Sequence, residues 1–467
     1  MPRHVPLDYN EGWHADHTLA AFSPRDLYPD PHAFFFNNYP PLSFLIVGAM
    51  TRLFGDAIVA GRVVSLVAFA CWAAILFAAA RRMRCSPAES LFGAVLFVAY
   101  TLAFSAYVGI DDPEFLAHAV QGVGLVLLLR DLRSGERRGR KAESVLDVPL
   151  TRGRILAVAA CFAAGVFVKH NAIALPLAAT AWLMVVDRPN GWRLAASGAA
   201  FGVAGAAICT FVFGDEFVAG VMMPRTYSLS GVVASTVRWA IRMPVFLAAL
   251  VVLCRRAPRD RHVWLCALYA AIGTAAGLLM LGGANVDWNV MFDSNAAFCL
   301  SAALAFNRLK QASGPLAQAR RLWLAGAYVA VILVAVLAAA RRQWGRADYW
   351  LARDDDVTRE AARDVAFLAG TPGPVMCENL ALCYWAGKRP EVDVFSFQQR
   401  VRLGWIDPRD LQTQIDGGYF AAIQLGALEQ YFDPRILDAL SRAYVRYRSD
   451  RFGVFLVRRE TRPATDR

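Results

Sequence analysis

Apolar residues in this chain are gathered into long blocks, and this pattern restricts the fold more than any other feature of the sequence. Hydrophobic residues make up 57% of the chain and charged residues only 19%, which excludes a disordered chain, a collagen or a coiled coil. Many blocks approach the roughly 17–25 residues that a helix needs to cross about 30 Å of hydrocarbon. The sequence therefore predicts a polytopic membrane protein. Its ten apolar stretches are 57–80, 88–106, 113–130, 154–168, 171–186, 193–213, 234–254, 262–281, 291–306 and 322–340.

The basic residues predict how these stretches are oriented. The net charge of +11 would suit a nucleic-acid-binding protein, but the tail 341–467 is nearly neutral, with 20 Lys and Arg against 18 Asp and Glu. Of the 29 Lys and Arg residues before the tail, 21 fall in alternate connections, which is the excess that cytoplasmic loops carry. We therefore expect no nucleic-acid partner, and we place residues 1–41 and the tail on the outer side. The basic, cytoplasmic connections are 81–87, 130–154, 187–193, 255–261 and 307–321.

Three segments depart from simple spans. Lys169-His170-Asn171 interrupts the apolar stretch 154–186, so we expect a hairpin of two short helices whose tip faces outside. The amphipathic stretch 39–54 follows Pro-Pro and is typical of a helix lying at the outer interface. The polar stretch 1–41 has no apolar segment before it, so we expect that a first helix is missing from this sequence. The alternative is that a short N-terminal tail crosses the membrane unaided.

The tail alternates short β-rich runs with helical runs, which predicts a small α/β domain after the membrane domain 1–340. Its charged residues have the pattern of a solvated face. Cys377 and Cys383 could pair if the tail faces an oxidising compartment, whereas the other seven cysteines lie in or beside apolar segments. The expected strands are 375–377, 420–425, 443–447 and 454–457, and the expected helices are 358–368, 408–415 and 434–440.

Polar residues that lipid contact does not explain all fall on the predicted outer side. Ionisable side chains at membrane depth are functional candidates by default, because burying them in hydrocarbon is costly. The candidates for catalysis are Asp8, Glu11, Asp111 and Asp112. The candidates for substrate binding are Asn38, Tyr39, Lys169, His170 and Asp293.

Each candidate also has a structural explanation, and the sequence leaves these alternatives open. Asp112 followed by Pro113 is typical of a helix N-cap, with Glu114 favouring the helix dipole. Lys169 could extend to the interface, and Asp8 and Glu11 could be solvated loop charges. For Asp287, near Asp293, we favour a structural role.

External carboxylates and a cation at membrane depth suit group transfer from a lipid phosphate. A carboxylate would take the proton of an acceptor hydroxyl or amine as a general base. Lys169, helped by His170, would stabilise the phosphate as its bond to the transferred group breaks. No nucleotide-binding glycine loop is present, so a nucleotide-linked donor is not supported. A divalent ion at Asp111 and Asp112 is conceivable, although two acids make a poor site by themselves.

The order of the motifs resembles a known family. They are a DY-x-EG loop, an NNYPPLSF segment, a GD…AGR helix start, a D-x-P loop, an FVKHN hairpin and a CENLALCYWAGK tail. In this order they resemble bacterial glycosyltransferase family 39 of the GT-C superfamily, which includes protein mannosyltransferases and lipid A aminoarabinose transferases. The resemblance covers about residues 7–460 and is most specific in the opening 70 residues.

The resemblance implies an inverting glycosyltransferase of the bacterial inner membrane with a periplasmic site. It would use a polyprenyl-phosphate-linked sugar and a glycan, lipid or protein acceptor. The family's acidic base corresponds to Asp8 or Glu11, its second acidic motif to Asp111 and Asp112, and its phosphate-binding lysine to Lys169. The family also begins with a membrane helix before the acidic loop.

The fold class that we expect is an all-α polytopic membrane domain, GT-C-like, with about ten spans and an interfacial helix, followed by a small extracytoplasmic α/β domain over 341–467. Two other functions stay open. A transporter would use the intramembrane acids and Lys169, although no inverted repeat is visible. A non-catalytic scaffold would use the tail as its working part.

Overall fold

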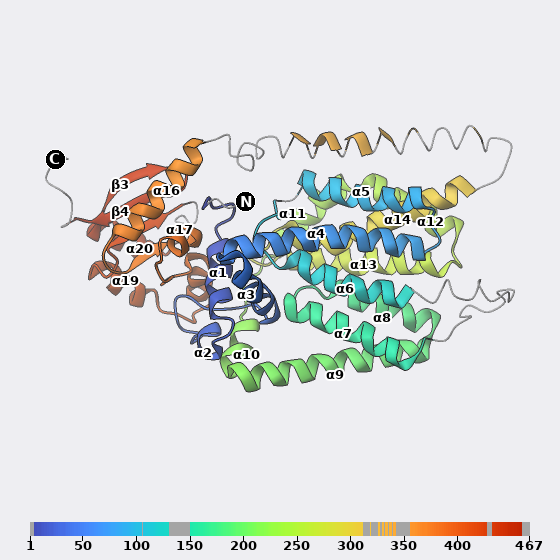
Figure 1. Ribbon diagram of the computed structural model, residues 1–467, viewed down its shortest axis with the longest axis horizontal. Coiled ribbons are helices and arrows are strands. Elements are labelled where there is room, and N and C mark those ends of the chain that lie inside the picture. Colours follow the sequence, from blue (N-terminus) through green and yellow to red (C-terminus); the bar gives the residue numbers. More distant parts are fainter. Residues whose placement is uncertain are drawn as a thin grey trace.

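The computed structural model describes residues 4–104, 106–129, 150–311, 355–426 and 432–459, with scattered positions between 318 and 341. Most of these residues are helical. Helices of the first two thirds run side by side along the long axis of the molecule, and the C-terminal α/β domain lies at one end, next to helices α1 (Glu11–Ala20), α2 (Pro24–Leu27) and α3 (Leu42–Phe54) (Figure 1). This arrangement confirms the predicted fold class.

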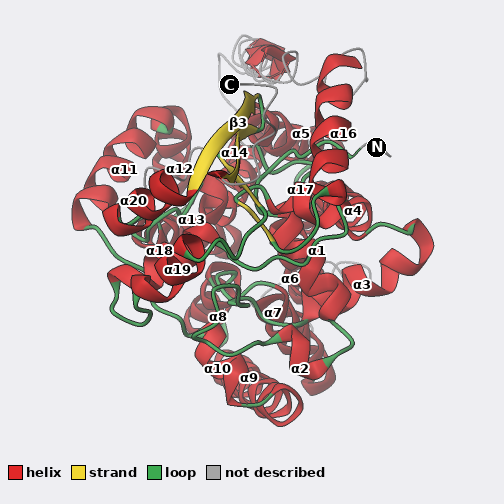
Figure 2. Cartoon of the chain, turned by 90° about the vertical axis from the view of Figure 1, so that its left-hand side faces the viewer, coloured by secondary structure: helices red, strands yellow, loops and turns green. Residues whose placement is uncertain are grey.

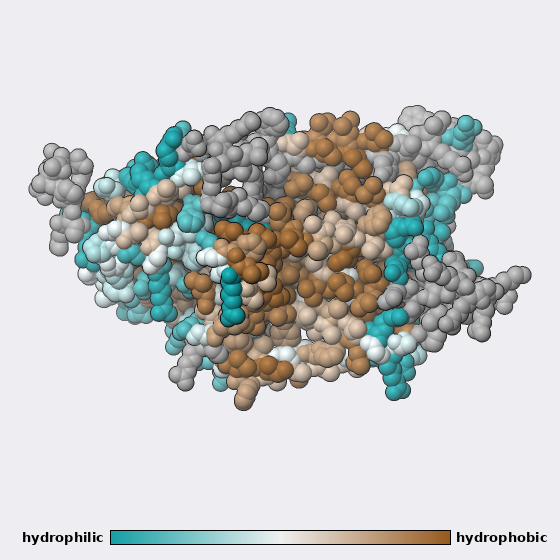
Figure 3. Space-filling view, viewed as in Figure 1, coloured by the Kyte–Doolittle hydropathy of each residue, from teal (hydrophilic) through white to brown (hydrophobic). Residues whose placement is uncertain are grey.

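The helix bundle is built from amphipathic and wholly apolar helices around one aromatic-rich core. Trp72, Trp182, Phe115 and Phe292 are almost completely buried in it. Apolar side chains also cover the outside of the bundle as a broad band between two hydrophilic ends (Figure 3). The bundle helices are α4 (Ala57–Arg82), α5 (Pro87–Phe104), α6 (Glu114–Leu129), α7 (Arg152–Val168), α8 (Ala174–Val186), α9 (Arg188–Phe213), α12 (Pro244–Arg256), α13 (Arg261–Met280) and α14 (Phe292–Gln311).

By length and composition, three described helices are able to cross a membrane: α4, α9 and α13. Shorter apolar helices run beside them, including α5, α6 and α8. The connections α4–α5, α8–α9 and α12–α13 lie at the end away from the C-terminal domain (Figure 1). These are three of the basic connections that the sequence placed together on one side. The predicted stretch 322–340 falls largely outside the described residues.

The apolar stretch 234–254 is not one straight helix. The chain forms α11 (Leu229–Arg242) and α12, which meet at an angle of 75°. Pro244 occupies the first turn of α12, where its missing N–H is harmless, but it cannot continue a preceding helix. Apolar residues of α11 such as Leu229 and Ile241 are more than 70% exposed, so much of this helix presents an apolar surface outward.

The predicted hairpin is present. Helix α7 ends at Val168 and α8 begins at Ala174, and Lys169, His170 and Asn171 form the tip between them. The predicted interfacial helix corresponds to α3, which ends at Gly55 in a left-handed conformation that favours glycine. The side-chain carboxylate of Asp56 then accepts a hydrogen bond from the Val59 N–H and starts α4.

The C-terminal domain contains a four-stranded sheet in the order β1-β2-β4-β3. Strand β1 (Val375–Cys377) pairs in parallel with β2 (Ala422–Leu425), and β4 (Gly453–Arg458) pairs antiparallel with β2 and β3 (Tyr444–Asp450). Helices surround this sheet (Figure 2). All four predicted strands and three predicted helices are present, whereas α17 and α18 were not predicted. The helices are α16 (Asp355–Gly370), α17 (Leu380–Trp385), α18 (Val394–Arg402), α19 (Pro408–Asp416) and α20 (Pro434–Ala443).

A disulfide joins Cys377 at the end of β1 to Cys383 in α17, and both residues are buried. Helix α17 packs against α1 so closely that a methyl group on Gly12 would lie 2.0 Å from the carbonyl carbon of Leu380. The disulfide therefore fixes the helix on which the first outer loop rests.

Replacing both Cys377 and Cys383 with serine should lower the thermal unfolding midpoint, because closing a short loop contributes about 2 kcal/mol. Cys71→Ser, at an exposed free cysteine of α4, is the matched control and should leave the midpoint unchanged. Thiol titration of the denatured, unreduced chain should count the seven free cysteines. A count that includes Cys377 and Cys383 would contradict the disulfide.

Candidate active site

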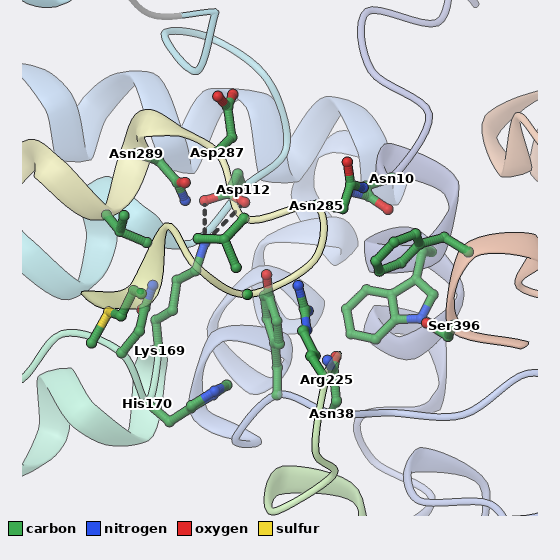
Figure 4. A pocket seen from close by; sticks show the side chains of 18 of the residues that line it. Asn10, Asn38, Asp112, Lys169, His170, Arg225, Asn285, Asp287, Asn289 and Ser396 are labelled. Carbon is green, nitrogen blue, oxygen red and sulfur yellow. Dashed lines mark hydrogen bonds and ion pairs between the residues drawn. The ribbon is translucent and has the colours of Figure 1, made fainter. Parts of the chain in front are cut away.

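A pocket of about 430 Å³ lies where the bundle meets the C-terminal domain. Its volume is in the range of small-molecule sites. Side chains from α1, the loop before α6, the hairpin tip, the loop 222–228, the 3-10 helix η3 (Trp288–Met291) and α18 converge on it (Figure 4). The polar and charged residues that line it include Asn10, Asn38, Asp112, Lys169, His170, Asn171, Arg225, Asn285, Asp287, Asn289, Asp393 and Ser396.

Lys169 is held by two carboxylates at the inner wall of this pocket. Its Nζ lies 3.0 and 3.1 Å from the two carboxylate oxygens of Asp112 and 2.9 Å from Oε2 of Glu114 (Figure 4 draws the Asp112 contact). Burial alone would lower the pKa of the lysine, but the two carboxylates outweigh it and raise the pKa well above its usual value. Lys169 is therefore a fixed positive charge already matched by acids, and only 3% of its side chain is exposed.

Asp112 serves two purposes at once. Its Oδ1 accepts a hydrogen bond from the Glu114 N–H at 2.8 Å, as the N-cap explanation requires, while both of its oxygens contact Lys169. Glu114, which the sequence assigned only to the helix dipole, is the second acid on Lys169 and also accepts from Asn289 Nδ2 at 2.8 Å. The sequence Asp112-Pro113-Glu114 did not predict this contact between Glu114 and Lys169.

Polar groups continue from Glu114 into the bundle. His118 Nε2 lies 3.3 Å from Glu114 Oε1, and its Nδ1 lies 3.7 Å from Asp293 Oδ1. The Tyr269 hydroxyl donates to the same Asp293 oxygen at 2.5 Å. Asp293 is thus part of a buried support behind the pocket and does not line it.

Glu11 lies beneath the pocket and is fully buried. Its carboxylate accepts from Arg62 of α4, with Nε at 2.7 Å and Nη2 at 2.5 Å, and also from the backbone N–H groups of Leu7 and Asp111 at 2.9 and 3.2 Å. Four donors occupy the lone pairs that a carboxylate offers, so no position is left for an acceptor proton.

The side chains of Asp111 and Asp112 make different contacts. Asp111 is 5% exposed, and its carboxylate packs against Gly61 of α4, where an added methyl group would lie 1.9 Å from Oδ1. Burial, together with Glu11 and Asp112, raises the pKa of Asp111 well above its usual value. Asp112 instead contacts Lys169, although both carboxylates line a second, small cavity with His14 and Ser43. No group of three or more His, Cys, Asp or Glu side chains able to hold a metal occurs among the described residues.

Asp8 does not itself line the pocket, but it directly precedes the lining residues Tyr9 and Asn10 and interacts electrostatically with the lining residues Asp112 and Asp287. It makes no ion pair within the described part of the chain, and its Oδ1 accepts from the Asn10 N–H at 2.9 Å. Burial raises the pKa of Asp8 to about 6, and the nearby carboxylates Glu11 and Asp112 add to this effect. Such a carboxyl is ionised at neutral pH and is basic enough to accept a proton.

Neutral rings and aromatic surfaces complete the inner wall. Burial, with Lys169 adding to it, lowers the pKa of His170 to about 4, so this imidazole supplies hydrogen bonds at neutral pH rather than charge. The predicted help from His170 is therefore not that of a second cation. Tyr39 lies with its ring 5.2 Å from Lys169 Nζ and 5.9 Å from the His170 ring, and Asn38 lines the pocket next to it.

Arg225 is the pocket residue that sequence reasoning missed. It projects from the loop 222–228 toward Asn285 (Figure 4), and its guanidinium lies 5.7 Å from the Phe395 ring. Its only hydrogen bond among the described residues is a long one, from Nη1 to the Ala284 carbonyl oxygen at 3.5 Å, and no described carboxylate pairs with it. Unlike Lys169, Arg225 makes no ion pair with a described carboxylate, and Asp393, which also lines the pocket, interacts with it only at longer range.

The C-terminal domain forms part of the pocket wall through Asp393, Phe395 and Ser396. The expectation that its charged residues form a solvated face is wrong for Asp393 and for Arg400, which are 8% and 1% exposed. The sequence pattern could not reveal this, because a polar residue that is buried against another domain looks the same in the sequence as one that faces solvent.

Of the nine predicted site residues, the pocket brings together Asn38, Tyr39, Asp112, Lys169 and His170. Asp8 does not line it but directly precedes two lining residues. Glu11, Asp111 and Asp293 lie behind it as buried groups. Asp287 lines the pocket and also caps η3, since its Oδ1 accepts from the Trp288 N–H at 2.7 Å.

Comparison with solved structures gives clear matches to membrane glycosyltransferases. ArnT from Cupriavidus metallidurans in the apo state matches with a TM-score of 0.58 and 15% identity, over 97% of this chain and 94% of that chain. The same protein bound to undecaprenyl phosphate gives a TM-score of 0.55, at the same identity and coverage. The oligosaccharyltransferase AglB from Archaeoglobus fulgidus, in complex with an inhibitory peptide and a dolichol-phosphate, gives 0.54 at 11% identity, over 99% of this chain and 72% of that one.

The chain has the GT-C fold. The resemblance read from the sequence is thereby confirmed at the level of the fold. No protein-family model and no curated protein matches the sequence significantly.

Glu11→Gln should destabilise the protein, because it leaves the buried Arg62 guanidinium without its counter-charge, which costs about 3–5 kcal/mol. The double variant Glu11→Gln, Arg62→Gln should recover part of the loss in thermal midpoint measured in detergent. Asp407→Asn, which breaks an exposed pair with Arg409, is the control and should change little. If Glu11→Gln kept the wild-type midpoint but abolished catalysis, Glu11 would be a catalytic base instead.

Proposed function

We propose that this protein is an integral membrane glycosyltransferase that moves a sugar, with inversion, from a polyprenyl-phosphate carrier to an acceptor on the outer side of a bacterial inner membrane. The observation that carries the proposal is Arg225, which makes no ion pair with a described carboxylate and lines a pocket that also holds carboxylates, asparagines and aromatic rings. The GT-C fold supports it, since solved structures of this fold hold undecaprenyl phosphate or dolichol-phosphate.

Asp8 is the general base in this proposal. Glu11 has no free lone pair, whereas Asp8 has no ion-pair partner among the described residues and a pKa of about 6. The acceptor oxygen or nitrogen attacks the anomeric carbon of the sugar as its proton passes to Asp8. A single displacement of this kind inverts the configuration at that carbon.

Arg225 binds the leaving phosphate. As the bond between the anomeric carbon and the phosphate oxygen breaks, its electron pair stays on the phosphate, and the growing negative charge is stabilised by a preorganised guanidinium. Arginine suits this task because its planar fork donates two hydrogen bonds to a phosphate. Lys169 adds to the positive field, but its two carboxylates already occupy its donors.

The sugar would lie between Asp8, the proposed base, and Arg225, the proposed phosphate-binding residue. Asparagine side chains offer both donors and acceptors to sugar hydroxyls, and Asn10, Asn38 and Asn289 project into this space. Rings of Trp13 and Tyr39, whose centroids are 5.2 Å apart, provide apolar surface for the sugar face. The same polar lining suits a hydroxyl or amine acceptor, so a glycan, a lipid or a protein remains within the proposal.

The outer side in this proposal is the periplasm, and two features support that location. The C-terminal domain, which contains the disulfide, lies at the end of the bundle opposite three basic connections (Figure 1), and this domain supplies part of the pocket wall. Disulfides persist in the periplasm and are rare in the cytosol.

Asp8→Asn should lower kcat by about 10²- to 10⁴-fold, the usual contribution of a general base, with little change in donor KM. For the wild-type protein, kcat/KM should fall below a pH of about 6, because protonated Asp8 accepts no proton. The Asn variant should lack this limb. Asp26→Asn, at an exposed acid of α2, is the control. A wild-type limb in Asp8→Asn would assign the base to another group.

Arg225→Ala should weaken binding of undecaprenyl phosphate by about 10- to 100-fold, since hydrogen bonds to charged groups contribute about 1.5–3 kcal/mol. Binding would be measured with the full chain in lipid nanodiscs. Arg435→Ala, at an exposed arginine of α20, should bind like the wild type. Unchanged binding in Arg225→Ala would remove this residue from the phosphate site and leave Lys169 as the candidate.

A further inference from the structure

The loop that carries Arg225 is held between two parts of the protein. On the membrane side, the Thr226 carbonyl accepts from the Ala284 N–H at 2.9 Å, and the Ser228 N–H donates to the Gly282 carbonyl at 2.8 Å. Tyr227 and Gly283 also form an antiparallel bridge. These contacts attach the loop to residues 282–284 of the membrane domain along one of its edges.

The other edge is bound by one residue of the C-terminal domain. Gln399 of α18 accepts two hydrogen bonds through the same Oε1 atom, from the Thr226 hydroxyl at 2.6 Å and from the Thr226 N–H at 3.3 Å. Only 6% of Gln399 is exposed, so water does not compete strongly for these donors. Thr226 follows Arg225 directly, and its backbone sets the direction in which the arginine leaves the loop.

Helix α18 is a rigid support for this contact. Arg400, next to Gln399, donates from Nη1 to the carbonyl oxygens of Pro31 and Ala33 at 2.6 and 2.5 Å, and its guanidinium lies 4.2 Å from the Phe36 ring. At its first turn, the Asp393 N–H donates to the Phe34 carbonyl at 3.0 Å. Helix α18 is therefore bound to the segment before Asn38 on one side and to the Arg225 loop on the other.

We propose that Gln399 is a positioning residue that orients Arg225 for the carrier phosphate, so that the C-terminal domain sets the affinity of the membrane domain for its lipid-linked donor. This inference rests on the proposed function, in which Arg225 binds that phosphate. Gln399 itself touches neither the phosphate nor the reacting atoms. Its effect passes through the Thr226 backbone and hydroxyl.

Gln399→Ala should weaken binding of undecaprenyl phosphate by about three- to tenfold, the effect of losing one or two neutral hydrogen bonds. In transfer assays the donor KM should rise by a similar factor and kcat/KM should fall at least as much, while the pH limb assigned to Asp8 stays unchanged. Gln412→Ala, at a glutamine of α19 remote from the pocket, is the matched control. A fall in kcat with unchanged KM would contradict a positioning role.

Substitutions of Thr226 test the same contact from the membrane domain. Thr226→Val removes the hydroxyl and should match Gln399→Ala, whereas Thr226→Ser keeps the donor and should bind like the wild type. Because both changes remove one interaction, the double variant Gln399→Ala, Thr226→Val should be no weaker than either single variant. Additive losses would show that the two residues act separately and would overturn the proposal.

Arg225→Ala separates the two proposals in the same binding assay. If Arg225→Ala weakens binding and Gln399→Ala does not, the positioning role fails and the proposed function stands. If Arg225→Ala has no effect, the phosphate assignment fails and the positioning role fails with it.

Discussion

Pairing of buried charges is the constraint on which the outer end of this protein depends. Lys169 and Arg62 are almost completely buried, and an unpaired charge at such a depth costs several kcal/mol. Each therefore meets carboxylates from a different segment. The Glu11–Arg62 pair joins α1 to α4, and the contacts of Lys169 with Asp112 and Glu114 join the hairpin tip to α6. These pairs place the loops that surround the pocket.

The same constraint decides which charges are available to a ligand. The lone pairs of Glu11 and the N–H donors of Lys169 are occupied by protein partners. These two residues therefore hold neighbouring segments in place and contribute to the electrostatic field of the pocket, but they are not free to bind a ligand directly. Asp8 and Arg225 lack ion-pair partners among the described residues; Asp8 directly precedes lining residues of the pocket, and Arg225 lines it. An acid that is free to accept a proton and a cation that is free to bind an anion are the two groups that transfer from a lipid phosphate requires.

Hydrophobic patterning predicted most of the fold, because membrane helices are long continuous apolar runs and the strands of the C-terminal domain are short β-rich runs. It did not predict the bend within 234–254, because apolar composition continues through the break that Pro244 imposes. It also identified the hairpin, since three consecutive polar residues at 169–171 have no other explanation in an apolar segment. Hydrophobic patterning could not distinguish Asp8 from Glu11, because Arg62, whose pairing with Glu11 favours Asp8 as the proposed base, lies 51 residues after Glu11.

Arg225 and Gln399 had no signal in the sequence, and the reason is physical. Both lie in short segments without periodicity or a recognisable motif, and each gains its role only from a contact between distant parts of the chain. Gln399 is 173 residues from Thr226, and Arg400 is 369 residues from Pro31. A domain that is attached by such buried polar contacts is not a separate module on a membrane enzyme. Its helix α18 completes the pocket wall, so the geometry of the proposed phosphate site depends on both parts of the chain being folded together.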